Sequence, residues 1–504
     1  MTTAFRPAER TGLPQGAGRP SGVPALTGER DFRRPSWFAA HPAWPVTALL
    51  AGYPLWWILG VGDYVWFLLP IPLFFRMVAW RRNGDRPLRV PPGFALWLLF
   101  LIWAVVAACT LTLSAPGTVS SPVSHRLVAW GVRTVSYVGI TVLFLYVGNL
   151  TEKELPRRKL VWLLGLLAIY TTVLGVAGMV APSLQFSSPT ALILPHSLQT
   201  NTFIAATTHP GLAEVQNVFG TVSAQGRPKA PFDYTNTWGE CLTITVPWLL
   251  VLCLGSDASR RRRILGWATL LFAMLALLYS LNRGAWIATG FAVVYLAVRL
   301  AAKGRIGMIG GLLALLGVAV IVVVATPLHT VISLRLQNGK SDDIRSSLFT
   351  LSLQDGLASP ILGYGDTRQQ RGSPQSIAIG PSAACEACGQ NEVGSTGQLS
   401  LLIVSTGFVG AGLYYGFFAY GAWRYRRDKT AYGQVGVLVI LMSFIYMFTY
   451  DAVAAPLGLT MLAYAVLWRN DAVRPPAQIP WPRRLARRTM DEAETAPEAT
   501  ARAR

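Results

Sequence analysis

The stretch LVWLLGLLAIYTTVLGVAGMVA, residues 160–181, contains no charged side chain and no proline. A helix crosses a bilayer core about 30 Å thick with roughly 20 apolar residues. This stretch therefore predicts a transmembrane helix, because a helix at the surface of a soluble protein would keep one polar face. The rest of the chain has the same character, since 52% of its 504 residues are hydrophobic and only 13% are charged.

This composition excludes several other classes of protein. So few charged residues cannot cover the surfaces of the roughly three soluble domains that the length would otherwise allow. A collagen, a coiled coil and a disordered chain are excluded on the same grounds. A transmembrane β-barrel is disfavoured, because the apolar runs are continuous rather than alternating. We therefore expect an all-α, polytopic membrane protein.

The same criterion of about 20 apolar residues predicts a bundle of about 12 transmembrane helices within residues 44–469. The first and the last of them are short and contain proline, so their boundaries are the least certain. The predicted helices cover residues 44–60, 62–80, 93–113, 126–148, 160–181, 239–255, 264–281, 284–300, 306–326, 397–421, 433–450 and 456–468.

Positive charge alternates between successive connections, and this alternation predicts the orientation. The short loops at 61–63, 114–125 and 451–455 contain no lysine or arginine. The positive-inside rule places the basic connections in the cytoplasm, and an even number of helices then places both termini there. The basic connections contain Arg81, Arg82, Arg86, Arg89, Lys153, Arg157, Arg158, Lys159, Arg260 to Arg263, Arg299, Lys303, Arg305, Arg424, Arg426, Arg427 and Lys429.

The net charge of +20 is thus mostly a topology signal for a multi-pass protein of the cell (plasma or inner) membrane, and it does not indicate a nucleic-acid partner. Residues 1–43, rich in arginine, proline and glycine, predict a disordered cytoplasmic tail, and residues 470–504 predict a second cytoplasmic tail. Two long loops, at about 182–238 and 327–396, are expected to face outward. Long loops beside a helical bundle usually carry function, so the chemistry is sought there.

Arg283 is the first candidate residue and lies in SLNRGAWIATG, residues 280–290, at the outer junction of two predicted helices. An arginine on this side opposes the positive-inside bias, and a charge near the bilayer is costly. The neighbouring Asn282 and Gly284 permit a tight turn and a close approach to a ligand. A functional role is favoured over an interfacial arginine that reaches toward the lipid headgroups.

Arg345 is the second candidate and lies in SDDIRSSLFTLSLQDGLASPILGYGD, residues 341–366. Ser341 is a suitable N-cap, and apolar residues recur at helical spacing from Ile344 to Leu351. This pattern predicts an amphipathic helix at the membrane surface, with Arg345 in its first turn. By itself, such an arginine would be an ordinary solvated side chain.

Arg126 and Arg133 are seven residues apart on the fourth predicted helix, a spacing that brings them to one helix face. Arg133 would lie about two turns inside the outer surface. An arginine within a membrane is a functional-site hypothesis by default. A structural role, in which the arginine pairs with Asp451 or Glu240, is the equal alternative.

Neither a metal nor another cofactor is expected. The histidines show no metal-binding spacing, and no Walker A loop, Rossmann fingerprint or Gly-x-Ser-x-Gly elbow occurs. Cys385 and Cys388 form the sequence CEAC in the second outer loop. Outside the cytoplasm this pair predicts a local disulfide better than half of a zinc site.

Residues from about 230 to 420 resemble the O-antigen ligase and O-antigen polymerase family of membrane glycosyltransferases. The resemblance rests on four segments in the right order, on the side predicted to be outside. They are PFDYTNTWGECLTITVPWLL (231–250), similar to the family's asparagine-bearing start of a span; SLNRGAWIATG, similar to its Ser-x-x-Arg-Gly segment; Arg345 with ASPILGYG (358–365), similar to its Arg-helix-Pro-Leu-x-Gly-x-Gly element; and GSTGQLSLLIVSTGFVG (394–410), similar to the start of the span that closes the large outer loop.

The resemblance implies a metal-independent transfer of a glycan from a polyprenyl-pyrophosphate-linked donor to an acceptor hydroxyl at the outer face of the membrane. The partners would be this donor, a glycan or lipid acceptor and membrane lipids, with the chain as a ligase or polymerase of envelope polysaccharide. Arg283 and Arg345 match the family's two functional arginines, and arginine suits a pyrophosphate leaving group because its charge and geometry match phosphate oxygens. The candidate substrate-binding residues are Arg126, Arg133, Asn236 and Asn282.

One departure from the family concerns the group that activates the acceptor. Family members usually carry a histidine just before the span that closes the large loop, and it is thought to be the general base. Here that stretch reads NEVGSTGQL, residues 391–399, and contains no histidine. Glu392 is the candidate substitute, and a base of this kind contributes about 10² to 10⁴ in rate. Another loop residue as base, or an acceptor that needs less activation, are the alternatives.

Two other functions remain open at this stage. A transporter or flippase of lipid-linked or envelope precursors would use many spans, but it usually places polar binding groups near the bilayer midplane. Here the predicted spans carry few charges and the polar residues concentrate in the outer loops. The missing histidine also leaves open a non-catalytic scaffold of an envelope-assembly machine.

Overall fold

A computed structural model describes residues 41–473, except for 85, 119–121, 196–198, 200–201, 217–224, 256, 305, 326–328, 331–332, 334–339 and 371–391. Nearly all of the tail predicted at 1–43, and the tail predicted at 470–504 beyond residue 473, lie outside these residues. The predicted disulfide of Cys385 and Cys388 also lies outside them. The compact unit described below belongs to Pro42–Arg504.

The described chain is helical almost throughout, as the composition predicts. Its first helices are α2 (Trp44–Ala51), α3 (Tyr53–Ile58), α4 (Val65–Leu68), α5 (Pro70–Arg82), α6 (Phe94–Val106), the 3-10 helix η1 (Ala107–Thr110), α7 (Val123–Asn149), α8 (Arg157–Val180), α9 (Pro189–Ile193) and α11 (Thr202–Thr208). The later helices are α12 (Thr235–Cys253), α13 (Arg260–Tyr279), α14 (Arg283–Ala301), α15 (Ile306–Ala325), α17 (Lys340–Ala358), α18 (Gln398–Tyr425), α19 (Ala431–Tyr446) and α20 (Ala455–Val473).

Two small antiparallel sheets lie within the long loops. Strand β1 (Ala213–Gln216) pairs with β2 (Gln225–Pro228), with Ala213 opposite Pro228. Strand β3 (Arg368–Gln369) pairs with β4 (Glu392–Val393), with Arg368 opposite Val393. The second pair joins the segment that follows α17 to the segment that precedes α18.

Five described helices are long and apolar enough to cross a membrane, namely α7, α8, α13, α14 and α18. Shorter apolar helices lie at Phe94–Thr110, Ile309–Ala325 and Ala431–Tyr446. Each predicted range contains helix, but the first is divided into α2 and α3, and the second into α4 and α5. The helical membrane character is therefore supported, and the number of twelve spans stays a prediction.

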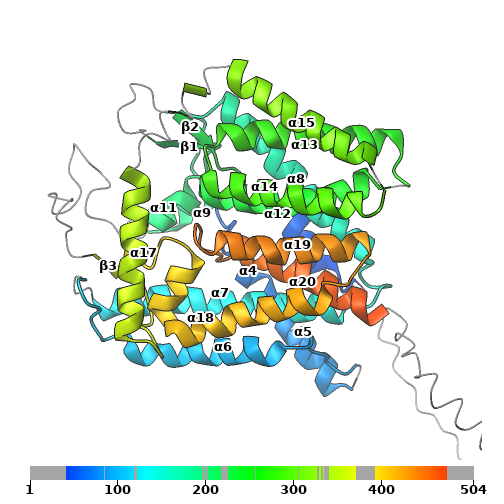
Figure 1. Ribbon diagram of the computed structural model, residues 1–504. Coiled ribbons are helices and arrows are strands. Elements are labelled where there is room, and N and C mark those ends of the chain that lie inside the picture. The colour runs from blue at the N-terminus through cyan, green and yellow to red at the C-terminus, as the bar shows by residue number, and fades with distance from the viewer. Residues whose placement is uncertain are drawn as a thin grey trace, which may run out of the picture. The chain divides into compact units, whose positions relative to one another are not determined.

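The long helices run mostly along a common direction, whereas α17 runs across them at one end (Figure 1). Helix α17 packs against α18 and β4. The strands β1 and β2 and helix α11 lie at the same end (left in Figure 1), which we call the α17 end. The helix predicted from residue 341 onward is confirmed, whereas its amphipathic character and its location at a membrane surface stay predictions.

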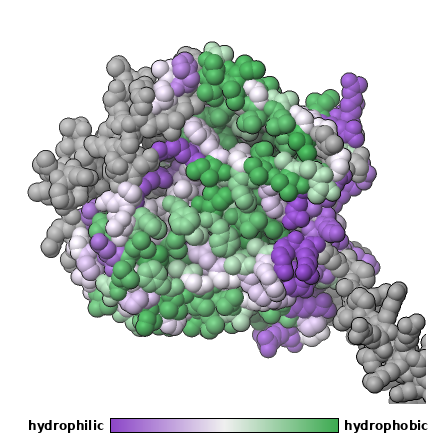
Figure 2. All heavy atoms as spheres, viewed as in Figure 1, coloured by the Kyte–Doolittle hydropathy of each residue, from purple (hydrophilic) through white to green (hydrophobic). Residues whose placement is uncertain are grey.

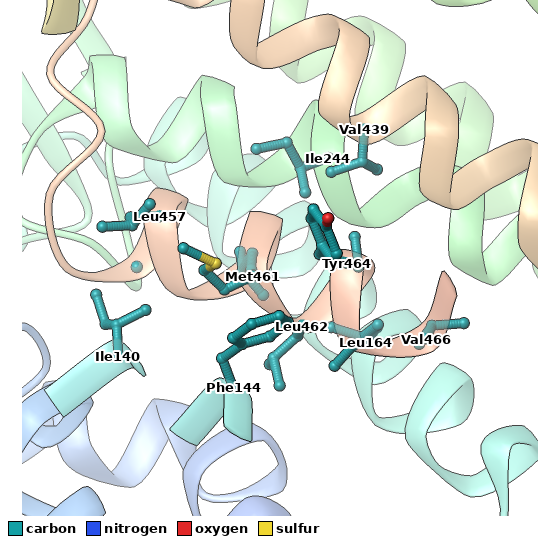
Figure 3. Close-up of a cluster of buried hydrophobic side chains, with 14 of the residues drawn as sticks. Ile140, Phe144, Leu164, Ile244, Val439, Leu457, Met461, Leu462, Tyr464 and Val466 are labelled. Carbon is teal, nitrogen blue, oxygen red and sulfur yellow. The ribbon is translucent and has the colours of Figure 1, made fainter. Parts of the chain in front are cut away.

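Helix α20 forms the centre of the packing, although its span is one of the two least certain in the sequence. Every residue from 454 to 470 is buried, which is typical of a helix that other helices surround on all sides. Its side chains pack between residues of α7, α8, α12 and α19 (Figure 3). The Tyr464 ring stacks on Phe417 of α18, with centroids 4.6 Å apart.

The turn that follows α17 packs on α18 at a break in that helix. Gly407 has φ 69° and interrupts the helix. The freed backbone groups bond the turn, since Tyr364 N donates to Val404 O at 2.7 Å and Phe408 N donates to Pro360 O at 2.8 Å. Gly363 also has a positive φ of 65°, and a Cβ there would lie 2.6 Å from Val404 O. The Gly-x-Gly sequence therefore allows the turn to dock closely on α18.

The opposite end of the bundle gathers the basic connections. Figure 2 shows hydrophilic residues at this end (right) and an apolar surface between the two ends. Arg469 of α20 donates to Glu152 in the α7–α8 connection at 3.0 Å, and Arg424 donates to Asp471 at 2.7 Å. Lys303 donates to Gln434 at 3.0 Å. These contacts place several of the basic connections side by side, as the alternation of charge predicts.

Candidate functional site

A largely buried ion pair connects α7 to the turn that docks on α18. Arg133 Nη2 donates to Asp366 Oδ1 at 2.9 Å, with side chains 15% and 6% exposed. Asp366 follows the docked turn directly, so the break in α18 sets its position. The ion-pair partner of Arg133 is therefore Asp366, and neither Asp451 nor Glu240, the two partners considered from the sequence.

Asp451 lies close to this pair, in the loop between α19 and α20. Its side chain is exposed, but the surrounding protein atoms replace part of its water, and this desolvation raises its pKa to about 7. The cations of Arg133 and Arg345 oppose this increase, whereas the negative charge of Glu392 adds to it. Four segments of the chain thus bring charged groups together at the α17 end.

Glu392, the base proposed from the sequence, lies on β4 in the same group. Desolvation raises its pKa, the neighbouring Asp366 raises it further, and a hydrogen bond from Thr367 lowers it. Thr367 Oγ1 donates this bond to Glu392 Oε2 at 3.3 Å. Arg345 of α17 donates a long hydrogen bond of 3.5 Å to Thr449 O, two residues before Asp451. Arg133, Arg345 and Glu392 are therefore brought together, as required of a common site.

Gln398, at the start of α18, holds the loop that carries Asp451. Its backbone N–H donates to Tyr450 O at 2.9 Å, and its Oε1 accepts from Ala452 N at 2.9 Å. Its Nε2 donates to Tyr137 Oη of α7 at 3.2 Å. The backbone on both sides of Asp451 is thus held by one buried residue, through its backbone N–H at Tyr450 and through its side chain at Ala452.

Asn282 and Arg283 are connected to the same loop. Asn282 is the N-cap of α14, since its Oδ1 accepts from Ala285 N at 3.0 Å, and Arg283 follows it, half-buried, at the first helical position. Tyr450 Oη donates to the same Asn282 Oδ1. The Tyr450 ring lies so close to Gly284 that a Cβ there would meet it at 2.8 Å. This packing anchors the beginning of α14, and with it Arg283, to the Asp451 loop.

Arg227 on β2 is a further arginine at this end that the sequence does not single out. Its side chain is buried, and its Nε donates to Ser280 O at 2.8 Å, three residues before Arg283. Burial lowers its pKa, and the cation of Arg345 lowers it further. Arg227 therefore lies close to both segments that carry the predicted arginines.

Asn236 and Arg126 differ in their relation to this group. Asn236 is half-buried in the first turn of α12, next to Thr235, whose carbonyl accepts from Asn282 Nδ2 at 3.3 Å. It therefore lies beside the beginning of α14. Arg126 is buried and donates to the carbonyls of Leu111 and Leu113, at 2.8 and 3.3 Å. These bonds hold the segment after η1, and Arg126 is not among the groups whose charge shifts the pKa of Asp451.

Arg126 nevertheless faces the same segment as Arg133, as the spacing of seven predicts. Arg368 of β3 is buried and donates to the two carbonyls that Arg126 bonds, at 3.5 and 3.1 Å. The cation of Arg126 contributes to lowering the pKa of Arg368 to about 10, after desolvation as the main cause. Arg133 bonds Asp366, two residues before Arg368. One face of α7 therefore carries both arginines toward residues 366–368.

Asp63 and Asp233 form a separate pair of carboxyl groups. Asp63, in the connection before α4, shares a hydrogen bond with Asp233, and desolvation raises the pKa of Asp63 well above its usual range. Thr207 Oγ1 donates to Asp233 Oδ2 at 2.8 Å, and Lys229 lies nearby. Burial and the neighbouring carboxylate of Asp233 both favour the protonated form of Asp63.

The chemistry available around Asp451 combines cations with a carboxylate that titrates near neutral pH. Arginines bind phosphate oxygens, and a carboxyl group with a pKa of about 7 exchanges its proton at physiological pH. Among the described residues, no group of three or more histidine, cysteine, aspartate or glutamate side chains is placed to hold a metal ion. The residues therefore suit reactions of anionic, phosphate-bearing substrates.

Sequence reasoning missed Asp366, Arg227 and Gln398, and named Asp451 only as a partner. Asp366 directly follows the Gly-x-Gly sequence, so its position was a usable signal. Gln398 begins the span that closes the large loop, at the place where a buried amide can serve several backbone groups. Arg227 carries no local signal, because only the pairing of β1 with β2 brings it to Ser280.

No protein-family model matches the chain, and neither does any curated protein or any solved structure. The resemblance of its four segments to the O-antigen ligase and polymerase family therefore stays a prediction.

Proposed function

We propose that this chain is a membrane-embedded glycosyltransferase that moves a glycan from a polyprenyl-pyrophosphate-linked donor to an acceptor hydroxyl. In this proposal the α17 end faces outward, the twelve predicted helices span the cell membrane and both termini lie in the cytoplasm. The acceptor is a glycan or a lipid of the envelope, and the enzyme acts as a ligase or polymerase of envelope polysaccharide. No metal ion takes part.

The observation that carries the proposal is the convergence of charged groups from separate segments at the α17 end. Arg133 of α7, Arg345 of α17 and Glu392 of β4 all act on Asp451 in the α19–α20 loop. Convergence of this kind is typical of a functional site, because holding several charges together opposes folding stability. Of these residues, Arg345 belongs to one of the four segments that resemble the family, and Asn282 and Arg283, which are connected to the Asp451 loop, belong to another.

The arginines are suited to bind the pyrophosphate group of the donor. As the glycosidic bond breaks, the pyrophosphate gains negative charge, and fixed cations stabilise that charge best where water is partly excluded. Arg345 is exposed and Arg283 half-buried, so both remain accessible to a bound phosphate. The polyprenyl chain would lie in lipid along the apolar surface of the helices, which explains why such an enzyme is embedded in the membrane.

The test compares Arg345→Ala and Arg283→Ala with Arg427→Ala, an exposed arginine at the opposite end. Full-length protein in lipid vesicles would receive a polyprenyl-pyrophosphate-linked oligosaccharide and a fluorescent acceptor, and transfer would be followed by chromatography. We expect each of the first two variants to lose about 10²-fold or more in rate, the effect of removing one donor that stabilises transition-state charge. Arg427→Ala should transfer at the normal rate.

A parallel test in cells would delete the gene and follow envelope glycans together with lipid-linked intermediates. The deletion should cause lipid-linked glycan to accumulate, and the Arg427→Ala protein should reverse this whereas the other two variants should not. Normal glycan from both Arg345→Ala and Arg283→Ala proteins, inserted at normal levels, would exclude these roles.

One observation favours a second candidate function, the transport of a lipid-linked or envelope precursor. Glu240 in α12 is 1% exposed, and its Oε2 has no hydrogen-bond partner among the described residues. Ionisable groups inside membrane helices often mark proton or substrate paths. Vesicles that move a fluorescent lipid-linked glycan between leaflets, depending on Glu240 and without forming a glycosidic bond, would support transport instead of transfer.

A further inference from the structure

We propose that Asp451, and not Glu392, is the base that removes the proton from the attacking acceptor hydroxyl, and that Gln398 positions it. This inference rests on the proposed function, and it assigns the role that the sequence left without a histidine.

The first argument is geometric, and concerns how Asp451 is held. Gln398 bonds the backbone on both sides of it, at Tyr450 O and Ala452 N, each at 2.9 Å. The Asp451 side chain itself is exposed and forms no hydrogen bond with the described residues. A catalytic base needs this combination, because the backbone must be fixed while the carboxylate oxygens remain available for a substrate proton.

The second argument is the charge around Asp451. The titratable or charged groups that act on it or feel its charge come from every neighbouring element: Arg133 and Tyr137 of α7, Arg345 of α17, Glu392 of β4, Glu240 of α12 and Tyr415 of α18. The two arginines favour the carboxylate, and Glu392 with the surrounding protein favours the acid. These opposing effects leave Asp451 with a pKa of about 7, which matches the working range of a general base.

The third argument concerns the alternative, Glu392. One of its oxygens already accepts from Thr367 at 3.3 Å, and its backbone lies in the β3–β4 pair. The negative charge of Asp366, which is ion-paired to Arg133, raises the pKa of Glu392. Glu392 therefore acts on Asp451 through its negative charge, which raises the pKa of Asp451.

The proposed step conserves atoms and charge. The acceptor hydroxyl oxygen forms a bond to the anomeric carbon of the donor glycan, and its proton passes to the Asp451 carboxylate. The bond from the anomeric carbon to the pyrophosphate oxygen breaks, and its electron pair leaves with the polyprenyl pyrophosphate beside the arginines. Asp451 then returns its proton to the water that reaches it.

The experiment measures the transfer rate as a function of pH, in vesicles that contain full-length protein, donor and fluorescent acceptor. For the unmodified chain we expect the rate to rise through about pH 7 and then level off, because only the ionised Asp451 accepts a proton. Asp451→Asn should lower the rate about 10²- to 10⁴-fold and abolish the step near pH 7. Asp451→Glu should retain part of the transfer rate and part of the pH step.

Glu392→Gln separates the two candidate bases. If Asp451 is the base, this variant keeps a pH step but moves its midpoint to lower pH, because the negative charge that raises the pKa of Asp451 is lost. If Glu392 is the base, the step disappears in Glu392→Gln and persists in Asp451→Asn, and the assignment is overturned. Gln398→Ala should lower the rate without moving the midpoint to higher pH, as a positioning residue requires.

Further controls keep the assignment distinct from misfolding and from the proposed function. Asp451→Ala with added formate should recover part of the rate, which a merely misfolded protein cannot do. A rate and a pH step in Asp451→Asn that equal those of the unmodified chain would refute the base but leave glycosyl transfer intact. An unmodified chain that transfers no glycan in vesicles would refute both proposals.

Discussion

The ion pair between Arg133 and Asp366 allows a quantitative test of how the bundle is held at the α17 end. Removing one partner leaves the other charge largely buried, with exposed fractions of 15% and 6% before the change. Breaking such a pair typically costs about 3 to 5 kcal/mol. We therefore expect Asp366→Ala to lower the free energy of unfolding by an amount in that range, and the double variant Arg133→Ala, Asp366→Ala to recover part of it.

The chain supplies its own comparison at the opposite end. Arg424 and Asp471 pair at 2.7 Å, but their side chains are 40% and 26% exposed. Exposed pairs contribute about 0 to 1 kcal/mol, because water competes with them and salt screens them. The two double-mutant cycles should thus differ by on the order of 2 kcal/mol in coupling energy, even though the distances are similar.

The assay is reversible unfolding in mixed micelles, with sodium dodecyl sulfate added to a mild detergent and tryptophan fluorescence as the signal. Each cycle needs the unmodified chain, two single variants and the double variant. Equal coupling energies for the two pairs would refute the reasoning, because burial would then have no influence on the strength of the pair. A large salt dependence of the Arg133 pair would refute it as well.

Three further predictions test the turn at Gly363, the buried Asp355 of α17 and the bonds between Gln398 and the Asp451 loop. Gly363→Ala should lower the free energy of unfolding by more than about 2 kcal/mol, because its Cβ would lie 2.6 Å from Val404 O at a φ of 65°. Gly412→Ala in α18 should not, because the space around its Cβ is open. Unfolding in mixed micelles measures both variants. Desolvation raises the pKa of Asp355 from 3.8 to about 6, so the folded chain should lose stability as pH rises from about 4 to 6, by on the order of 3 kcal/mol, and Asp355→Asn should remove this dependence in unfolding curves taken across that range. Gln398→Ala should lower kcat about 10²-fold while KM for the donor stays constant, because the Gln398 side chain orients the Asp451 loop and binds no phosphate. A rise in KM alone would contradict this.

The sequence is a good guide to the long apolar helices and a poorer guide to the bounds of α20. Continuous apolar runs predict α7 and α8 within a few residues, because a lipid environment demands about 20 apolar residues in succession. Helix α20 was assigned a short range, 456–468, but extends from Ala455 to Val473. Its length is supported by packing partners, which no local pattern of residues can show.

The candidate site divides in the same way. Arg133 stands out in the sequence because a charge within a predicted span is unusual, whereas Arg345 and Glu392 are singled out by the resemblance, and the structure brings the three together. The partner of Arg133 was not predictable, because Asp366 is more than 200 residues away and reaches α7 only through the docked turn. Asp451 likewise gains its character from neighbours on α7, α17 and β4, and none of them is near it in sequence.

The burial of α20 from residue 455 to residue 470 also has a consequence for biosynthesis. The ribosome makes this helix after all the helices that surround it, so α7, α8, α12 and α19 are synthesised before their common centre exists. Until then, the apolar and small-residue faces that will receive α20 can contact only lipid or one another. Assembly of the bundle is therefore completed late in translation, and the Asp451 loop, which leads directly into α20, takes its final position with that last step.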